Sequence, residues 1–93
     1  MDYSFYFLTR KPQDGSEMCA VYLRKINENM FETGIRILNG SERPYLAVCE
    51  RTPVVTDAYW FYEHNKDRAI QAGYTHVLND VNSIINTTVN GGF

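Results

Sequence analysis

No segment of this 93-residue chain approaches the roughly 18 consecutive apolar residues that a membrane-spanning helix needs. The first residues also lack the basic region and apolar stretch of a secretory signal. With 9 basic and 11 acidic residues, the formal net charge is −2. This balance excludes a strongly acidic DNA mimic and argues against a general binder of nucleic acid or anionic membranes. We therefore expect a soluble, cytoplasmic protein without a membrane partner.

Cysteine and histidine are also scarce. Cys19 and Cys49 are the only cysteines, His64 and His76 are the only histidines, and their spacing matches no zinc site. No serine lies in a nucleophile-elbow context, and the glycines near the C-terminal end precede no helix that would bind a phosphate. We predict no metal, no cofactor and no enzymatic activity. A small enzyme in which a histidine approaches Cys49 stays open, because catalytic partners need only be close in the fold.

The first half of the chain is rich in alternating side chains. Residues 3–10 and 17–25 predict two strands joined by a turn around Asp14-Gly15. The polar residues 26–33 predict a loop, and residues 35–38 a third strand. Asn39-Gly40 predicts a turn before a fourth strand over residues 45–50. Together these strands predict an antiparallel meander.

The two cysteines fall on different faces of this predicted sheet. Cys19 shares its parity with Val21 and Leu23, whereas Cys49 has the opposite parity to Leu46 and Val48. Because successive side chains of a strand point to opposite faces, the two sulfurs should lie too far apart for a disulfide.

From residue 54 the apolar period becomes helical, and it predicts a helix over 54–72 with Thr56 as an alternative start. Thr52 and Pro53 suit the N-cap and the first helical position, and Gly73 suits the C-terminal end. The positions that recur at this spacing are Val54, Ala58, Phe61, Asn65, Ala69 and Ala72.

The last twenty residues predict less structure. Residues 74–78 suggest a short extended return, and Asp80 is placed to cap a last helical turn through Ile84 and Ile85. Residues 86–93 are expected to form a flexible tail. The predicted class is therefore α+β: one domain over 1–93, with an antiparallel sheet of about four strands covered on one face by one main helix.

Four consecutive aromatics, Tyr59 through Tyr62, are the most distinctive feature. One face of a helix cannot bury four neighbouring rings. In the structural interpretation, Trp60 and Phe61 cover the sheet, and Tyr59 and Tyr62 flank them with their hydroxyl groups exposed to water. In the functional interpretation, two or more rings form a hot spot for another protein or a homodimer seam. Asp57 and Glu63 would then form a polar rim that favours a basic partner.

We expect a non-enzymatic protein–protein interaction module that occupies a surface on a larger protein or complex. Small chains without motifs are typical of phage or mobile-element products that inhibit host defence or transcription complexes, including anti-CRISPR and anti-restriction proteins. Such a product would act in the host cytoplasm. The predicted contact residues are Asp57, Tyr59, Trp60, Tyr62 and Glu63 on the helix, with Arg36 and Arg51 on the sheet.

The alternative is a module that contacts single-stranded nucleic acid or RNA. Tyr6, Tyr22 and Tyr45 would supply stacking rings on the sheet. The basic residues expected near one end of the sheet are Arg24, Lys25, Arg36 and Arg51. Acidic residues interrupt them, so no continuous basic track emerges and nucleic acid ranks below a protein partner. Glu63 and Asp67, four residues apart on the helix, are interpreted as part of a solvated surface of mixed charge.

Overall fold

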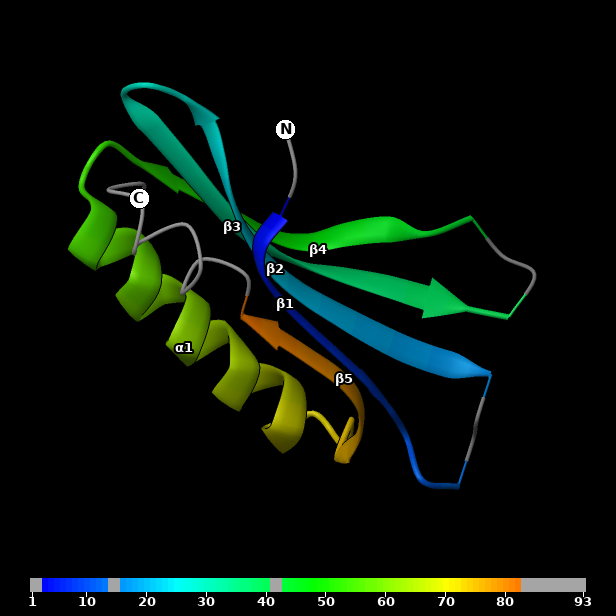
Figure 1. The fold of residues 1–93 in the computed structure, drawn as a ribbon. Coiled ribbons are helices and arrows are strands. Elements are labelled where there is room, and N and C mark those ends of the chain that lie inside the picture. Colours follow the sequence, from blue (N-terminus) through cyan, green and yellow to red (C-terminus); the bar gives the residue numbers. More distant parts are fainter. Residues whose placement is uncertain (1–2, 14–15, 41–42, 83–93) are drawn as a thin grey trace.

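The computed structural model describes residues 3–13, 16–40 and 43–82. In these ranges the chain forms one sheet and one helix that covers one of its faces (Figure 1). The sheet has five strands in the order β4-β3-β2-β1-β5, and all neighbours are antiparallel. The elements are β1 (Tyr3–Arg10), β2 (Glu17–Asn27), β3 (Met30–Asn39), β4 (Tyr45–Thr52), α1 (Val55–Gln71) and β5 (His76–Asn82). The predicted α+β meander is confirmed, with one strand more than expected.

The core lies between α1 and the middle of the sheet. Phe7, Val21 and Ile35 stand opposite one another on β1, β2 and β3, and all three side chains are buried. The residues two positions away on each strand share this buried face, because alternate side chains point to the same side. Most of them are apolar, and the exceptions are Thr9 and Thr33. The helix contributes Ala58, Tyr62 and Ala69 to the same cluster, listed in full as Phe5, Phe7, Cys19, Val21, Leu23, Phe31, Ile35, Ile37, Ala58, Tyr62, Ala69 and Tyr74.

The predicted loop over residues 26–33 is wrong. β2 continues to Asn27, β3 begins at Met30, and Glu28 and Asn29 alone form the turn. The side-chain oxygen of Asn27 accepts the backbone N–H of Asn29 at 2.8 Å, which stabilises the reversal. The polar residues after this turn form a strand because neighbouring strands supply their partners, which sequence patterning does not reveal.

The helix spans almost the predicted range, but its N-terminus is built differently. Thr52 ends β4 and Val54 is the N-cap, without a side-chain cap. The Thr52 hydroxyl accepts the Val54 N–H at 3.1 Å, so Thr52 stabilises the turn before the helix. At the other end Gly73 has a φ of 106°, and the N–H groups of residues 73 and 74 donate to the carbonyls of Ile70 and Ala69. This is a Schellman ending, and it confirms the stop predicted at Gly73.

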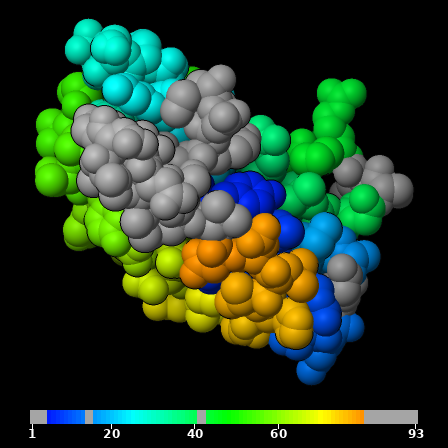
Figure 2. Space-filling model, viewed as in Figure 1, coloured from blue at the N-terminus to red at the C-terminus, as the bar shows by residue number. Residues whose placement is uncertain are grey.

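The segment predicted as a short return is a full strand. β5 pairs antiparallel with β1, from Arg10 opposite His76 to Phe5 opposite Asn82. Asp80 lies within this strand, so the prediction that it caps a helix is wrong. Its carboxylate is 4.0 Å from Lys66 Nζ, and the end of α1 (yellow) and β5 (orange) lie next to each other in Figure 2. The predicted helical turn through Ile84 and Ile85 and the tail over 86–93 lie outside the described residues.

Both edges of the sheet are irregular. On β4 the register shifts at Ala47, because Ile35 stands opposite Val48 whereas the next residue of β3 stands opposite Leu46. On β5 the register shifts in the same way at Leu78. Such bulges twist an edge and interrupt its row of backbone hydrogen-bonding groups. Within the described ranges, no helix has the length and apolar character to cross a membrane.

Candidate functional site

The outward side of α1 carries Trp60, the most exposed aromatic side chain among the residues that the structure describes, closely followed by Tyr45 of β4. The buried positions Ala58, Tyr62, Asn65 and Ala69 turn one side of the helix to the sheet. Trp60 lies on the opposite side and is 59% exposed. The interpretation in which Trp60 covers the sheet is therefore wrong, because the helical phase directs Tyr62 inward instead.

Tyr62 is a core residue and not a surface contact, in contrast to the prediction. It is only 2% exposed, and its ring packs 5.0 Å from that of Phe5. Lys66 Nζ lies 5.5 Å from the Tyr62 ring centroid and 4.8 Å from that of Phe7. Burial raises the pKa of the Tyr62 hydroxyl, and this hydroxyl has no hydrogen-bond partner among the residues that the structure describes. Tyr62 therefore packs α1 against the sheet.

Tyr59 lies at the boundary between core and surface. Its ring meets the Phe5 ring edge-on at 5.4 Å, yet the residue remains 45% exposed. One edge of the ring is thus held by the sheet while the rest faces solvent. Held rings lose little conformational freedom on binding, which is why aromatics of this kind serve as contact residues.

Trp60 is also held in place. The His64 ring, one helical turn further on, stacks on the indole at 5.0 Å with an interplanar angle of 15°. The Phe61 ring meets the indole edge-on at 5.5 Å. We call the surface formed by Asp57, Tyr59, Trp60, Glu63 and His64 the helix patch. It brings together four of the seven predicted contact residues.

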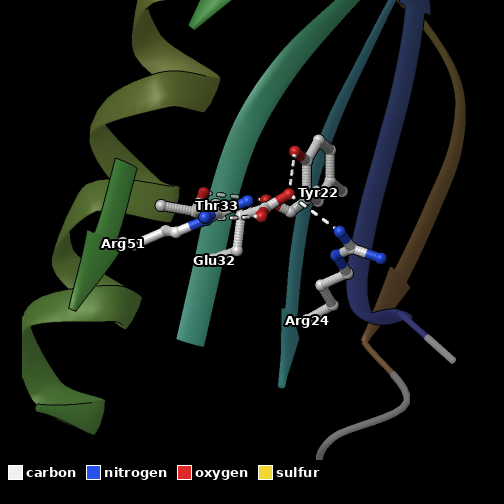
Figure 3. Close-up of polar contacts among 5 residues, drawn as sticks. All are labelled: Tyr22, Arg24, Glu32, Thr33 and Arg51. Atoms are coloured by element: carbon white, nitrogen blue, oxygen red, sulfur yellow. Dashed lines mark hydrogen bonds and ion pairs between the residues drawn. The ribbon is translucent and has the colours of Figure 1, made fainter. Parts of the chain in front are cut away.

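A second polar cluster lies on the sheet face that α1 leaves uncovered. Its centre is Glu32 of β3, which is only 3% exposed (Figure 3). Tyr22 donates its hydroxyl to Glu32 Oε2 at 2.6 Å. Arg24 donates to the same oxygen at 3.2 Å, and Arg51 Nε donates to Oε1 at 2.9 Å. Three strands thus converge on one carboxylate.

The electrostatics of this cluster favour an ionised Glu32. Burial acts to raise the pKa of its carboxyl, but the hydrogen bonds from Tyr22 and Arg51 and the charges of both arginines outweigh it, so the pKa is lowered. Burial also raises the pKa of Tyr22, and its bond to Glu32 adds to that effect. The Tyr22 ring lies over Gly34, where an added Cβ would be 2.7 Å from the tyrosine oxygen.

The predicted sheet contacts are partly engaged within the fold. Arg51 is tied to Glu32, although its side chain is 61% exposed. Arg36 is exposed and stands between Ala20 and Leu46 on the neighbouring strands. Tyr22, one of the three stacking rings of the nucleic-acid alternative, is buried and therefore not accessible to a base, whereas Tyr45 is exposed. Sequence reasoning missed Glu32, whose hydrogen-bond partners come from the two neighbouring strands β2 and β4.

Asn65 is a further buried polar residue, and it ties the helix to the sheet. Its amide nitrogen is 3.3 Å from Thr33 Oγ1 and 3.2 Å from Glu50 Oε1. Its oxygen accepts a hydrogen bond from Arg68 at 3.0 Å. The helical spacing predicted Asn65 as inward-facing, although not with these partners.

The two cysteines lie in different environments. Cys19 is buried, and burial raises its pKa to about 11, whereas Cys49 is exposed and both are free thiols. The prediction that they do not bridge is confirmed. A cleft of about 430 Å³ is lined by Lys11, Pro12, Gln13, Glu17, Ala72 and Gly73, and thus by no cysteine or histidine. Among the residues that the structure describes, no three His, Cys, Asp or Glu side chains gather at a spacing suited to a metal ion.

Comparison with known proteins gives no relative: no family model, no curated protein and no solved structure matches this chain. The geometry of the chain itself is therefore the basis for any functional argument.

Proposed function

We propose that this protein is a non-enzymatic binding module that uses the helix patch to occupy a surface on a larger protein. The observation that carries the proposal is the exposure of Trp60, a large ring that does not belong to the core cluster of the described residues. Tryptophan is enriched among residues that dominate binding energy, and rigid anchoring of such a ring lowers the entropic cost of association.

The surroundings of Trp60 support the same conclusion. His64 and Phe61 restrain the indole, and Tyr59 supplies a second half-exposed ring on the same element. Side chains on a helix are positioned more rigidly than side chains on loops. Inhibition of a host complex by occlusion, the finer expectation from the sequence, would be one use of such a surface.

The experiment is affinity purification of the tagged chain from its native host, with and without nuclease treatment, followed by mass spectrometry. We expect a stoichiometric protein partner that survives nuclease and is lost with Trp60→Ala. The matched control is Leu46→Ala, which removes an exposed apolar side chain from the edge strand β4 and should leave binding unchanged. Both variants should retain the wild-type circular dichroism spectrum.

Two outcomes would contradict the proposal. Binding of the same partner by the Trp60→Ala variant would show that the helix patch is not the contact surface. Loss of every partner on nuclease treatment would instead favour the nucleic-acid alternative, whose contacts would be Arg24, Arg36 and Arg51 on the uncovered face. In that case binding should weaken steeply with salt.

A further inference from the structure

We infer that the helix patch receives a cationic surface, with an arginine or lysine side chain of the partner protein placed against Trp60. This inference rests on the proposed function and specifies the chemistry of the partner.

Carboxylates flank Trp60 along the helix. Asp57 precedes Trp60 by three residues and Glu63 follows it by three, and residues at this spacing are neighbours on a helix surface. Asp67 lies a further turn along the same side, and all three acidic residues are exposed. A cation that approaches the indole on the side opposite the stacked His64 ring would thus meet a negative charge in either direction along the helix, which adds to the attraction of the ring itself.

The two basic side chains of α1, Lys66 and Arg68, do not neutralise the helix patch, because both are engaged with other groups. Lys66 is drawn inward over the rings of Phe7 and Tyr62. Its ammonium is shared between Glu63 at 3.9 Å and Asp80 at 4.0 Å. Arg68 donates to Asn65 and lies 3.8 Å from Glu50 of β4. Asp57 and Asp67 have no ion pair with any described residue, so the rim of the helix patch stays acidic.

The same charges disfavour a second copy of this chain as the occupant. A two-fold contact places the same patch on both sides of the interface. Asp57 and Glu63 of one protomer would then face the same carboxylates of its partner around two apolar rings. Like charges brought together in an interface cost several kcal/mol and suppress the wrong partner. A partner protein with a basic surface would not cause this repulsion. The charge pattern of the helix patch therefore favours such a partner over self-association.

The first test uses Trp60 as its own reporter, since it is the only tryptophan. Its fluorescence is quenched with caesium and with iodide at constant ionic strength, and N-acetyltryptophanamide serves as the uncharged reference. Relative to this reference, we expect caesium to quench Trp60 more efficiently than iodide. The Asp57→Asn/Glu63→Gln variant should move the ratio toward the reference. Equal or reversed preference in the wild-type protein would overturn the acidic-patch argument.

The second test asks whether the patch selects cations in a binding partner. The probe is a helical peptide with a leucine stripe bordered by arginines, and the matched peptide carries glutamates in place of the arginines. We expect the arginine peptide to shift Trp60 emission, and its Kd to rise several-fold between 50 and 300 mM salt. The glutamate peptide should not bind. Equal binding of the two peptides, or no binding of either, would overturn the inference.

Two variants separate this inference from the proposed function. Asp57→Asn/Glu63→Gln should weaken binding of the arginine peptide several-fold, while Glu28→Gln on the β2–β3 turn should leave it unchanged. If the native partner depends on Trp60 but is insensitive to Asp57→Asn/Glu63→Gln, the inference fails and the proposed function stands. If the partner is insensitive to both Trp60→Ala and the charge variant, the proposed function fails as well.

Discussion

The two buried tyrosines Tyr22 and Tyr62 offer a direct test of the packing, because the same substitution should have opposite effects at the two positions. Both are almost fully buried, at 3% and 2% exposure. Tyr22 donates a 2.6 Å hydrogen bond to the Glu32 carboxylate. Within the described ranges, the Tyr62 hydroxyl has no hydrogen-bond partner. Replacement by phenylalanine removes only the hydroxyl oxygen and keeps the ring.

The expected magnitudes follow from what each hydroxyl does. A hydrogen bond to a charged group contributes about 1.5–3 kcal/mol, so Tyr22→Phe should lower the free energy of unfolding by about 2 kcal/mol. Burial of a hydroxyl without a partner costs about 1–3 kcal/mol in protein mutational data, so Tyr62→Phe should be neutral or stabilising by up to about 1 kcal/mol. For a domain of this size, 1 kcal/mol corresponds to about 4–8 °C in Tm.

Urea denaturation followed by far-ultraviolet circular dichroism measures both free energies, and thermal melts give the Tm values. The difference between the two variants, about 2–3 kcal/mol, exceeds the error of linear extrapolation for a small domain. A destabilisation by Tyr62→Phe equal to that of Tyr22→Phe would refute the reasoning, because the Tyr62 hydroxyl would then have a partner. A neutral Tyr22→Phe would show that the bond to Glu32 makes no net contribution.

Three further predictions concern the uncovered face and the thiols. The lowered pKa of Glu32 means that its ionised form is favoured by folding. Its contribution to stability should be complete above the ordinary glutamate pKa of about 4.3 and be lost as the pH falls through the lowered value, and Glu32→Gln should reduce this acid dependence in thermal melts. Gly34→Ala places a Cβ 2.5 Å from the Val48 carbonyl oxygen, so it should destabilise the protein by about 1–3 kcal/mol in urea denaturation; an unchanged midpoint would contradict the close packing of β3 and β4. In the native protein a thiol reagent should modify one equivalent, at the exposed Cys49, and two only after denaturation.

The strands were predictable from sequence where alternation is local. Within residues 17–25, Cys19, Val21 and Leu23 share one parity and belong to the core. The same parity rule, applied to residues 45–50, placed Cys49 on the opposite face of the sheet. The end of the helix was equally accessible, because Gly73 is the residue type that the left-handed position requires. Such signals depend on the chain's own neighbours and need no knowledge of the tertiary structure.

The candidate site was predictable only in part, because the phase of the helix is ambiguous in sequence. Phe61 and Tyr62 each fit between Ala58 and Asn65, at spacings of three and four residues. In the structure Tyr62 faces inward, and its ring contacts Phe5 of β1. These two residues are far apart in the sequence, so local patterning does not reveal the contact. Glu32 was missed for a related reason. Its partners come from β2 and β4, so its burial depends on pairing that the sequence does not show.

The sheet edges also expose apolar side chains, and their geometry explains why the helix patch is the better docking surface. Tyr45 and Leu46 are exposed on β4, and Val77 and Leu78 on β5. Docking at an edge requires an added strand to match an uninterrupted row of backbone groups. Both edges shift register beside these residues, and such bulges oppose strand addition. The apolar surface of α1 has no comparable interruption, and its rings are already restrained, so a partner can engage it without rearrangement of the fold.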